Sequence, residues 1–538
     1  MRLINALIKT SNLISYRSFL KGSDDVLKIQ EFYLLDIIKD NCDTVYGRRF
    51  KFSEINGISE YQKQVPISDY DDHESYIKMH MEGTEKGLVE EPIELFELSS
   101  GSTAASKYIP YTKGLQSDYM AGVKPWLYNL YHHYPELMQG KAYWSVSPIA
   151  SERTYTTSGI PIGFQDDTGY FDFIQKHLFN KLFVIPSEIK LISDMEDFRY
   201  VTLLFLLKEK KLSLISVWNP TFLINLLEVF FTYQAQLIED IERGQITLPN
   251  HSDLPLSLRK RVKPSKKRAS ELRQLSTKTG RCIFHEVWLN LRLISCWDQG
   301  NSKPYKKRLE GYFSDVAIQG KGLLATEGIV SIPLEGIGCP VSYRSHFFEF
   351  QDRDNNEIKL LHELEKGKLY DVIMTTRGGL YRYRLNDIVK VTRHYHQVPC
   401  IEFIGKASNV SDFFGEKINE MHVRDIFSRL QLLDAFIFLA PTQQGDNFCY
   451  TLFTVVERDD LSSIVEEELS KNFHYKYARD LNQLDHVRVF KMTGDYEKAY
   501  YDFLATRKNM KLGDIKFQSL IKVTGINEAV EGDYILER

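Results

Sequence analysis

Helical patterns at the N-terminus of the chain give way to alternating strand and helix signals. Alternating or wholly apolar runs predict strands at ELFELSS, KAYWSVSP, LRLISCW and GLLATEGIVSIPL. Between the second and third of these, the apolar stretch LINLLEVFFTYQAQLIEDIERGQ predicts a long helix. This alternation is typical of α/β proteins, in which helices cover the sheets. We therefore expect a large α/β domain of several layers.

A hairpin is predicted in DVIMTTRGGLYRYRLNDIVKV, because Gly378 and Gly379 separate two strand-like runs. The two-residue period of a strand places Tyr381, Tyr383 and Leu385 on one face and the intervening arginines on the other.

The pattern changes after IEFIGKAS. A helix from about Glu416, a hairpin in AFIFLAPTQQGDNFCYTLFTVVE, two more helices and the strand HVRVFKM follow. This length of chain suits a separate small α+β domain. We place the boundary near Gly405, which gives a large domain of residues 1–405 and a small domain of residues 406–538.

Composition narrows the classes of partner. A chain of 538 residues exceeds one ordinary domain, and a formal charge of −4 gives no overall attraction to nucleic acid or to an anionic membrane. The basic stretch from Leu258 to Arg273 lacks interleaved aromatics, which favours a solvated helix and loop over a nucleic-acid site.

Localisation follows from what the sequence lacks. The cysteines are scattered without a C-x-x-C pair, and neither a secretory leader nor a run of eighteen apolar residues is present. We expect a cytoplasmic protein with reduced cysteines and no membrane or nucleic-acid partner.

The loop SSGSTAASKYIPYT, Ser99 to Thr112, is the first candidate for chemistry. It follows the strand-like EPIELFEL, and backbone N–H groups, hydroxyls and the charge of Lys107 suit a triphosphate. The hydroxyl donors are Ser99, Ser100, Ser102 and Thr103. A plain turn with a helix cap is the alternative. The loop lacks the G-x-x-x-x-G-K-[ST] pattern, which argues against kinases and GTPases.

Three further features fall near predicted strand ends. ATEG contains Glu327, and a carboxylate that shares Mg2+ with substrate phosphates is a common arrangement. Asp387 in YRYRLNDIV suits the paired hydroxyls of a ribose. Lys516 in LGDIKF is the third. Taken singly, each of them also fits a solvated or turn-capping residue.

In this order, the features resemble the adenylate-forming superfamily. Within it, the chain looks most like the acyl acid amido synthetases, the auxin-responsive-promoter family, in a bacterial-type version. The resemblance covers most of the chain, through YGRRFKFSEI, YQKQVPISDYDD, the loop, SVWNPTFL, LISCWDQGNSKPY, GKGLLATEGIVSIPL, YRYRLNDIVKV and FFGEKINE.

The resemblance implies the adenylate-forming fold, in which a small mobile C-terminal domain closes over the site. It also implies a ligase that uses ATP and Mg2+. A carboxylate attacks the α-phosphate to give acyl-AMP and pyrophosphate, and an amine, typically of an amino acid, then displaces AMP to form an amide. Which acid and which amine are used, and the oligomeric state, stay open.

The resemblance also assigns roles to residues. Thr326 and Glu327 would lie by the α-phosphate with Glu327 on Mg2+, Asp387 would hold the ribose, and Lys516 would act in adenylation. The residues that line the phosphates would be Ser99, Ser100, Gly101, Ser102, Thr103 and Lys107. Rotation about Gly405 would switch between the half-reactions.

Four positions depart from the superfamily pattern. Ala104 and Ser106 replace a frequent Gly and Pro in the loop, and Asn386 replaces the usual Gly before the aspartate. Asn tolerates the left-handed region better than most residues. Lys406, a further nucleotide-binding candidate, replaces an Arg and so exchanges a planar fork for a point charge.

Two alternative functions stay open. An acyl-CoA ligase shares the adenylation step and passes the acyl group to a thiol, although ATEG and EKINE favour the amide-forming branch. A non-catalytic protein of the same fold that binds a small acid is the second.

Overall fold

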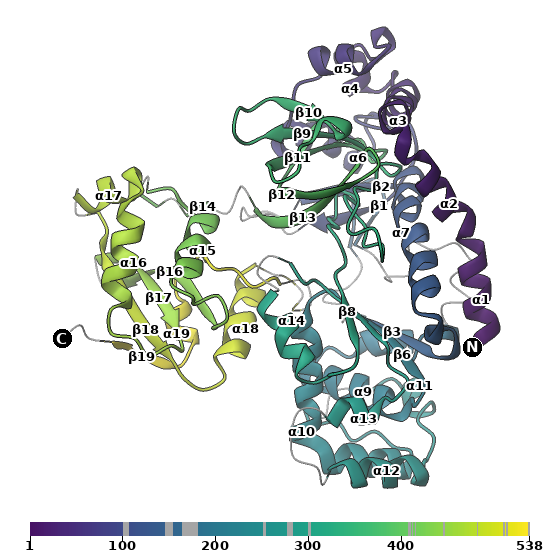
Figure 1. The fold of residues 1–538 in the computed structure, drawn as a ribbon, viewed down its shortest axis with the longest axis vertical. Coiled ribbons are helices and arrows are strands. Elements are labelled where there is room, and N and C mark those ends of the chain that lie inside the picture. The colour runs from purple at the N-terminus through teal and green to yellow at the C-terminus, as the bar shows by residue number, and fades with distance from the viewer. Residues whose placement is uncertain are drawn as a thin grey trace.

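The computed structural model describes residues 1–99, 107–145, 154–163, 181–250, 254–276, 283–299, 303–406, 410–411, 413–414, 416–444, 447–480, 483–508, 510, 512 and 515–535. Figure 1 shows a large body with two stacked halves and a smaller C-terminal part, green to yellow, at one side. The predicted α/β class is confirmed.

The upper half of the body in Figure 1 contains two sheets and most of the N-terminal helices, the first of which extends down to the level of the lower half. Its described strands have the orders β2-β1-β5-β4 and β10-β9-β11-β12-β13. The strands are β1 Ile93–Ser99, β2 Lys107–Thr112, β4 Thr154–Tyr155, β5 Pro161–Ile162, β9 Phe347–Asp352, β10 Ile358–Leu360, β11 Leu369–Thr375, β12 Tyr383–Tyr395 and β13 Val398–Lys406. The helices are α1 Arg2–Ser11, α2 Leu13–Lys21, α3 Val26–Asp40, α4 Val45–Arg49, α5 Ile58–Gln64, α6 Tyr70–Glu82 and α7 Lys113–His133.

The lower half is built on a parallel sheet of order β3-β6-β7-β8. Every residue of its strand LSLIS is buried, as parallel strands with both faces covered require. The strands are β3 Lys141–Trp144, β6 Leu212–Ser216, β7 Leu293–Ser295 and β8 Ala317–Gln319. The helices are α9 Met195–Lys208, α10 Pro220–Arg243, α11 Leu256–Arg259, α12 Lys266–Ser276, α13 Ile283–Val287 and α14 Lys303–Glu310.

Helix α10 confirms the long helix predicted from the apolar stretch. Asn219 caps its N-terminus by accepting from Thr221 N, and Pro220 occupies the first turn, where no N–H partner is needed. Among the described helices, α10 alone is long and apolar enough to cross a bilayer. Half of its most apolar stretch is buried inside the protein, and buried core helices of soluble proteins have the same composition.

The C-terminal part has a mixed sheet of order β16-β17-β18-β19. The predicted hairpin is confirmed as β16 and β17, and β18 confirms the strand HVRVFKM. Its elements are β14 Val410–Ser411, β15 Ile418–Asn419, α15 Glu420–Arg429, β16 Ile437–Gln444, β17 Asn447–Thr454, α16 Leu461–Ser470, α17 Phe473–Asp480, β18 Asp485–Met492, α18 Tyr496–Lys508, α19 Ile526–Ala529 and β19 Gly532–Ile535. The division at Gly405 stays a prediction.

The C-terminal part packs against the lower half of the body through both apolar and charged contacts. Phe517 lies 6.3 Å from Tyr305 between ring centroids, and one buried cluster includes side chains from both parts. Arg308 of α14 donates to both carboxylate oxygens of Glu497 on α18, at 2.9 and 2.8 Å. Both hydrogen bonds come from Arg308 Nη1, and charge-assisted hydrogen bonds of this kind are stronger than neutral ones.

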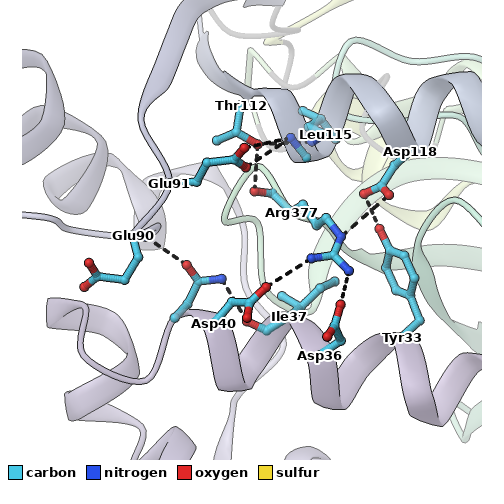
Figure 2. A network of polar contacts seen from close by, with 12 residues as sticks. Tyr33, Asp36, Ile37, Asp40, Glu90, Glu91, Thr112, Leu115, Asp118 and Arg377 are labelled. Atoms are coloured by element: carbon cyan, nitrogen blue, oxygen red, sulfur yellow. Dashed lines mark hydrogen bonds and ion pairs between the residues drawn. The ribbon is translucent and has the colours of Figure 1, made fainter.

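A charged network ties the hairpin turn to the N-terminal helices (Figure 2). Arg377, beside the Gly378-Gly379 turn, forms ion pairs with Asp36, with Asp40 at 3.3 Å and with Asp118 at 3.7 Å. Tyr33 donates to the Asp118 carboxylate from α3. Burial raises the pKa of Asp118, and the Tyr33 hydrogen bond and the Arg377 charge oppose that shift. Arg377 thus joins β11 to α3 and α7.

Replacing Arg377 by Met is expected to lower the free energy of unfolding by about 3 kcal/mol, because a buried carboxylate loses its cation. Urea titration followed by circular dichroism measures the change. In the R377M/D118N double variant the deficit should shrink, since no buried charge is then uncompensated. An R377M variant as stable as the wild type would contradict a structural role for the network.

Candidate functional site

An irregularity in β12 sets the orientation of the backbone at Asp387. Asp371 on β11 is the register partner of Ile388, and Ile373 is the partner of Arg384, so β12 has extra residues at this point. Asn386 has φ +60°, the left-handed conformation that Asn tolerates and that bulges often use. Asp387 is 2% exposed and is the register partner of Lys406 on β13.

Lys406 is the charged neighbour of Asp387. Its Nζ lies 3.2 Å from Asp387 Oδ1, and its side chain is 49% exposed. The Asp387 charge raises the pKa of Lys406, more than burial lowers it. Asp387 Oδ1 is shielded from solvent and accepts no well-formed hydrogen bond among the described residues, so its contact with Lys406 is ionic. The Asp387 carboxylate therefore keeps acceptor capacity for a ligand hydroxyl.

Thr326 and Glu327 form the tip of a tight turn. Ala325 N donates to Gly328 O at 3.0 Å, and Gly328 N donates to Ala325 O at 3.2 Å. The hydroxyl of Tyr111 donates to Thr326 O at 2.5 Å from the neighbouring β2. The turn is thus held from outside, as a precisely placed carboxylate needs.

The turn is also closely packed from beneath. A Cβ at Gly328 would lie 2.2 Å from Met374 Cε and 2.7 Å from His346 Nε2, so any other residue there would require these side chains to move. His346 accepts from Ile329 N at 3.0 Å. Burial lowers the pKa of His346 to about 3, which keeps the ring neutral and able to accept.

Glu327 and the surrounding charges share one site. Glu327 is 7% exposed; burial raises its pKa, the charges of Lys406 and Lys107 lower it, and Asp387 raises it. Lys107 Nζ donates to the Tyr383 hydroxyl at 3.3 Å. Two carboxylates and two lysines that are far apart in sequence therefore converge between β2, the 325–328 turn, β12 and β13.

Lys516 reaches the large body from the C-terminal part. Its Nζ lies 4.1 Å from the ring centroid of Trp297, beyond β7, and 5.7 Å from that of Phe403 on β13. At about 3.3 Å per strand residue, Phe403 is about 10 Å along β13 from Lys406. The structure thus places Lys516 near the strand end that contributes Lys406.

Hydrogen bonds on both sides hold the segment that contains Lys516. Asn219 Nδ2, at the start of α10, donates to Ile515 O at 2.5 Å. Ser519 N donates to Glu420 Oε1 at 2.7 Å, and Glu420 belongs to the EKINE motif. EKINE therefore supports the segment of the late lysine, a link that the sequence alone did not reveal.

Part of the predicted phosphate loop lies outside the described residues. These positions are Ser100, Gly101, Ser102, Thr103 and the two departures Ala104 and Ser106. Ser99, the last residue of β1, and Lys107, the first of β2, are register partners. Of the loop candidates, the structure therefore describes Lys107 in full and Ser99 by its backbone.

Sequence reasoning missed a tryptophan layer at the carboxyl edge of the parallel sheet. Trp144 ends β3, whereas Trp218 and Trp297 each follow the last residue of a strand by two positions. Trp126 of α7 completes the layer, with its ring 6.0 Å from that of Trp144. The signal was present, because tryptophan is rare in this chain and two of the residues close the motifs SVW and SCW.

The residues present fit both ATP and Mg2+. Among the described residues no group of three His, Cys, Asp or Glu side chains could hold a metal by protein ligands alone. Mg2+ needs only one or two carboxylates when it also binds substrate phosphates, and Glu327 provides one. Asp387 retains acceptor capacity for a ribose, and Lys107 and Lys406 are cations suited to phosphates.

Two lysines and two carboxylates lie close together at strand ends, and a third lysine approaches from the C-terminal part; this is the arrangement that the predicted adenylate-forming ligase requires. Comparison with known proteins agrees. The sequence matches the GH3 family N-terminal domain over residues 15–318 and the GH3 family central domain over residues 339–406. The chain belongs to the GH3 family, and the predicted class of ATP-dependent, AMP-forming amide ligase is confirmed.

Several similar proteins of known function are plant enzymes. Jasmonoyl-L-amino acid synthetase GH3.5 of Oryza sativa subsp. japonica is 26% identical over 426 residues, which cover 72% of this chain and 71% of that protein. Indole-3-acetic acid-amido synthetase GH3.10 of Arabidopsis thaliana is 24% identical over 428 residues, 71% of each chain. The solved structure of AtGH3.15 acyl acid amido synthetase in complex with 2,4-DB has a TM-score of 0.80 at 18% identity and covers 97% of both chains.

Proposed function

We propose that this protein adenylates a small carboxylic acid with ATP and transfers the acyl group to the amine of an amino acid. The observation that carries the proposal is the convergence of Lys107, Glu327, Asp387 and Lys406, with Lys516 approaching from the C-terminal part. The similar plant enzymes are named for joining jasmonate or indole-3-acetic acid to an amino acid or amine, which supports this substrate class.

The reaction needs no covalent intermediate on the protein. A carboxylate oxygen of the acid bonds to the α-phosphorus of ATP, and the bond to the pyrophosphate oxygen breaks. The amine nitrogen then bonds to the acyl carbon, AMP leaves with the electron pair of the broken C–O bond, and the nitrogen loses a proton. Such a site acts by orientation and by stabilising charge on the phosphates.

Each charged side chain has a role in this proposal. Asp387 accepts from the ribose hydroxyls, and Lys406 beside it neutralises charge on the nucleotide. Lys107, with the hydroxyl-rich loop, binds phosphate oxygens. Thr326 and Glu327 lie by the α-phosphate, where Glu327 would hold Mg2+ and the ion would neutralise phosphate charge.

Lys516 stabilises the charge that develops during adenylation, and rotation of residues 406–538 about Gly405 would then expose the acyl-AMP to the amine. The contacts of Lys516 with the large body support the first of these roles. We further propose that the protein is cytoplasmic and of the bacterial type, as its sequence pattern indicates.

Purified protein with ATP, Mg2+ and a panel of aryl, indolyl and fatty acids tests the function through pyrophosphate release. Adding either mixed amino acids or CoA identifies the acceptor by mass spectrometry. An amide is the expected product. A thioester without amide would instead identify an acyl-CoA ligase, and binding of an acid without pyrophosphate release would identify a non-catalytic protein.

Replacing Asp387 by Ala is expected to weaken nucleotide use by about 10- to 100-fold, the effect of losing a charged hydrogen bond. This loss should appear as a higher KM for ATP in pyrophosphate exchange. D371N is the matched control, because Asp371 lies on the adjacent strand β11, where it is ion-paired with Arg353. Unchanged exchange in D387A would remove Asp387 from the ribose role.

A further inference from the structure

Lys321 is a buried lysine that the adenylation chemistry leaves without a role. It follows β8 by two residues and is 6% exposed. Its Nζ donates to Ser216 Oγ at 2.7 Å and lies 3.5 Å from Ser295 Oγ, at the ends of β6 and β7. Among the described residues no carboxylate forms an ion pair with it. Burying an ammonium group without a counter-ion costs folding free energy, and such groups are concentrated at functional sites.

Three tryptophans surround the ammonium group. The ring centroids of Trp126, Trp144 and Trp218 lie 5.7, 5.3 and 5.1 Å from Lys321 Nζ. Indole faces attract a cation and present flat apolar walls. Trp144 and Trp218 are half-buried, so the layer is not sealed within the core.

The same layer leads to the predicted reaction centre. The ring of Trp218 lies 5.9 Å from the ring of Trp297, and Lys516 Nζ lies over the latter. Lys321 is also only six residues before Glu327 in a segment that runs from the sheet edge to the Thr326-Glu327 turn. Ligands of parallel α/β sheets bind outside the carboxyl ends of the strands, which is where this layer lies.

We propose that Lys321 binds a substrate carboxylate other than the one that is activated. The ligand is either an acyl acid with a second carboxylate or the α-carboxylate of the acceptor amino acid; both present the same chemistry to the lysine. The proposal rests on the proposed function for the identity of the substrates. An entering carboxylate would supply the missing counter-ion, with the tryptophans enclosing the rest of the molecule.

Of the charged and titratable groups near the tryptophan layer, Lys321 is the one whose charge is expected to change near neutral pH. Burial lowers its pKa to about 7, and burial raises the pKa of the nearby Cys296 to about 12, so the thiol stays neutral. Asp298 beside Gly320 is paired with Lys306 at 3.4 Å. Glu335 accepts from Gln319 at 2.9 Å. Because the free lysine loses its proton above pH 7, binding of a carboxylate should weaken above that pH.

The direct test is binding, followed by the fluorescence of the tryptophan layer. The wild type and K321M are titrated with benzoate, isophthalate, glycine and glycinamide, each with the non-hydrolysable ATP analogue AMPCPP and Mg2+. The wild type should prefer isophthalate over benzoate, or glycine over glycinamide, by about 10- to 100-fold, and K321M should lose that preference. The preference should decline above pH 7 in the wild type alone.

Turnover distinguishes the two sources of the carboxylate. If K321M raises the KM for the acid in pyrophosphate exchange, the acid supplies the carboxylate; if only the amide-forming step suffers, the amino acid supplies it. S216A, which removes the oxygen that accepts from Nζ, should give a smaller change in the same step.

The melting temperature of K321M tests whether Lys321 has a merely structural role. K321M should melt at or above the wild-type temperature, because it removes a buried ammonium. The proposal is overturned if folded K321M keeps the wild-type preference for carboxylates, or if the wild type has none. It is also overturned if folded K321M loses exchange with every acid, which would make Lys321 part of the adenylation chemistry. Failure of the wild type to release pyrophosphate would count against the proposed function and leave the binding result standing.

Discussion

The K516A variant is expected to lose pyrophosphate exchange by about 10²- to 10³-fold, whereas amide formation from supplied acyl-AMP should stay within a few-fold of the wild type. A loss of this size is typical when one preorganised hydrogen-bond donor to a developing anion is removed. The two half-reactions separate because the proposed role of Lys516 is to neutralise the charge that develops as the bond between the α-phosphorus and pyrophosphate breaks, and pyrophosphate has left before the amine attacks.

The position of Lys516 supports this split. Its ammonium lies 4.1 Å from the Trp297 ring centroid and is held there by a segment that the large body anchors at Asn219. Shortening the side chain leaves these backbone anchors in place, so the fold should be kept. K498A is the matched control, because Lys498 lies exposed on α18 in the same part of the protein.

Pyrophosphate exchange and single-turnover amide formation, measured on the same preparations, test the prediction. K516R should recover part of the exchange, since it keeps the charge. Equal loss of both half-reactions in K516A would mean that the residue is structural or that its role is misassigned.

The sequence predicted the elements whose periodicity is strong. The α10 helix, the β16–β17 hairpin and the β18 strand follow directly from apolar patterns that local geometry imposes. GLLATEGIVSIPL was predicted as a strand, and the structure instead has isolated bridges there, such as Leu324 to Ile329. The apolar residues in this segment pack into the core without a partner strand, which a pattern of hydrophobic residues cannot distinguish from a strand.

The strand period did not reveal the environment of Arg382. The period placed it opposite the buried tyrosines, and Tyr381 and Tyr383 are indeed buried. Arg382 is nevertheless 5% exposed and donates to both oxygens of Glu349, at 2.9 and 2.8 Å. A second covered face and a partner 33 residues away satisfy its charge, and neither can be read from local sequence.

The candidate site was predictable only where a motif was known. Glu327, Asp387 and Lys406 came from the resemblance, and the structure brings them together. Lys321 was passed over, because its environment is built by helix α7 and by the ends of three strands that are far apart in the sequence. Long-range packing decides the chemistry of such a residue, and one sequence does not contain that information in a local pattern.

Replacing Glu327 by Gln is expected to reduce pyrophosphate exchange by about 10²- to 10³-fold and to raise the Mg2+ concentration needed for half-maximal rate. Gln keeps the size of Glu, so the turn between Ala325 and Gly328 and its hydrogen bond from Tyr111 should persist.

The E327Q change removes the negative charge of a side chain that is 7% exposed and lies near two lysines. Those lysines would then attract the ATP phosphates against one carboxylate, Asp387, instead of two, so ATP binding should be kept or tightened while the rate falls. Titrating Mg2+ and ATP separately measures the two effects, with E310Q on the exposed end of α14 as the control. A variant whose Mg2+ dependence matches the wild type would exclude Glu327 as the metal-binding carboxylate.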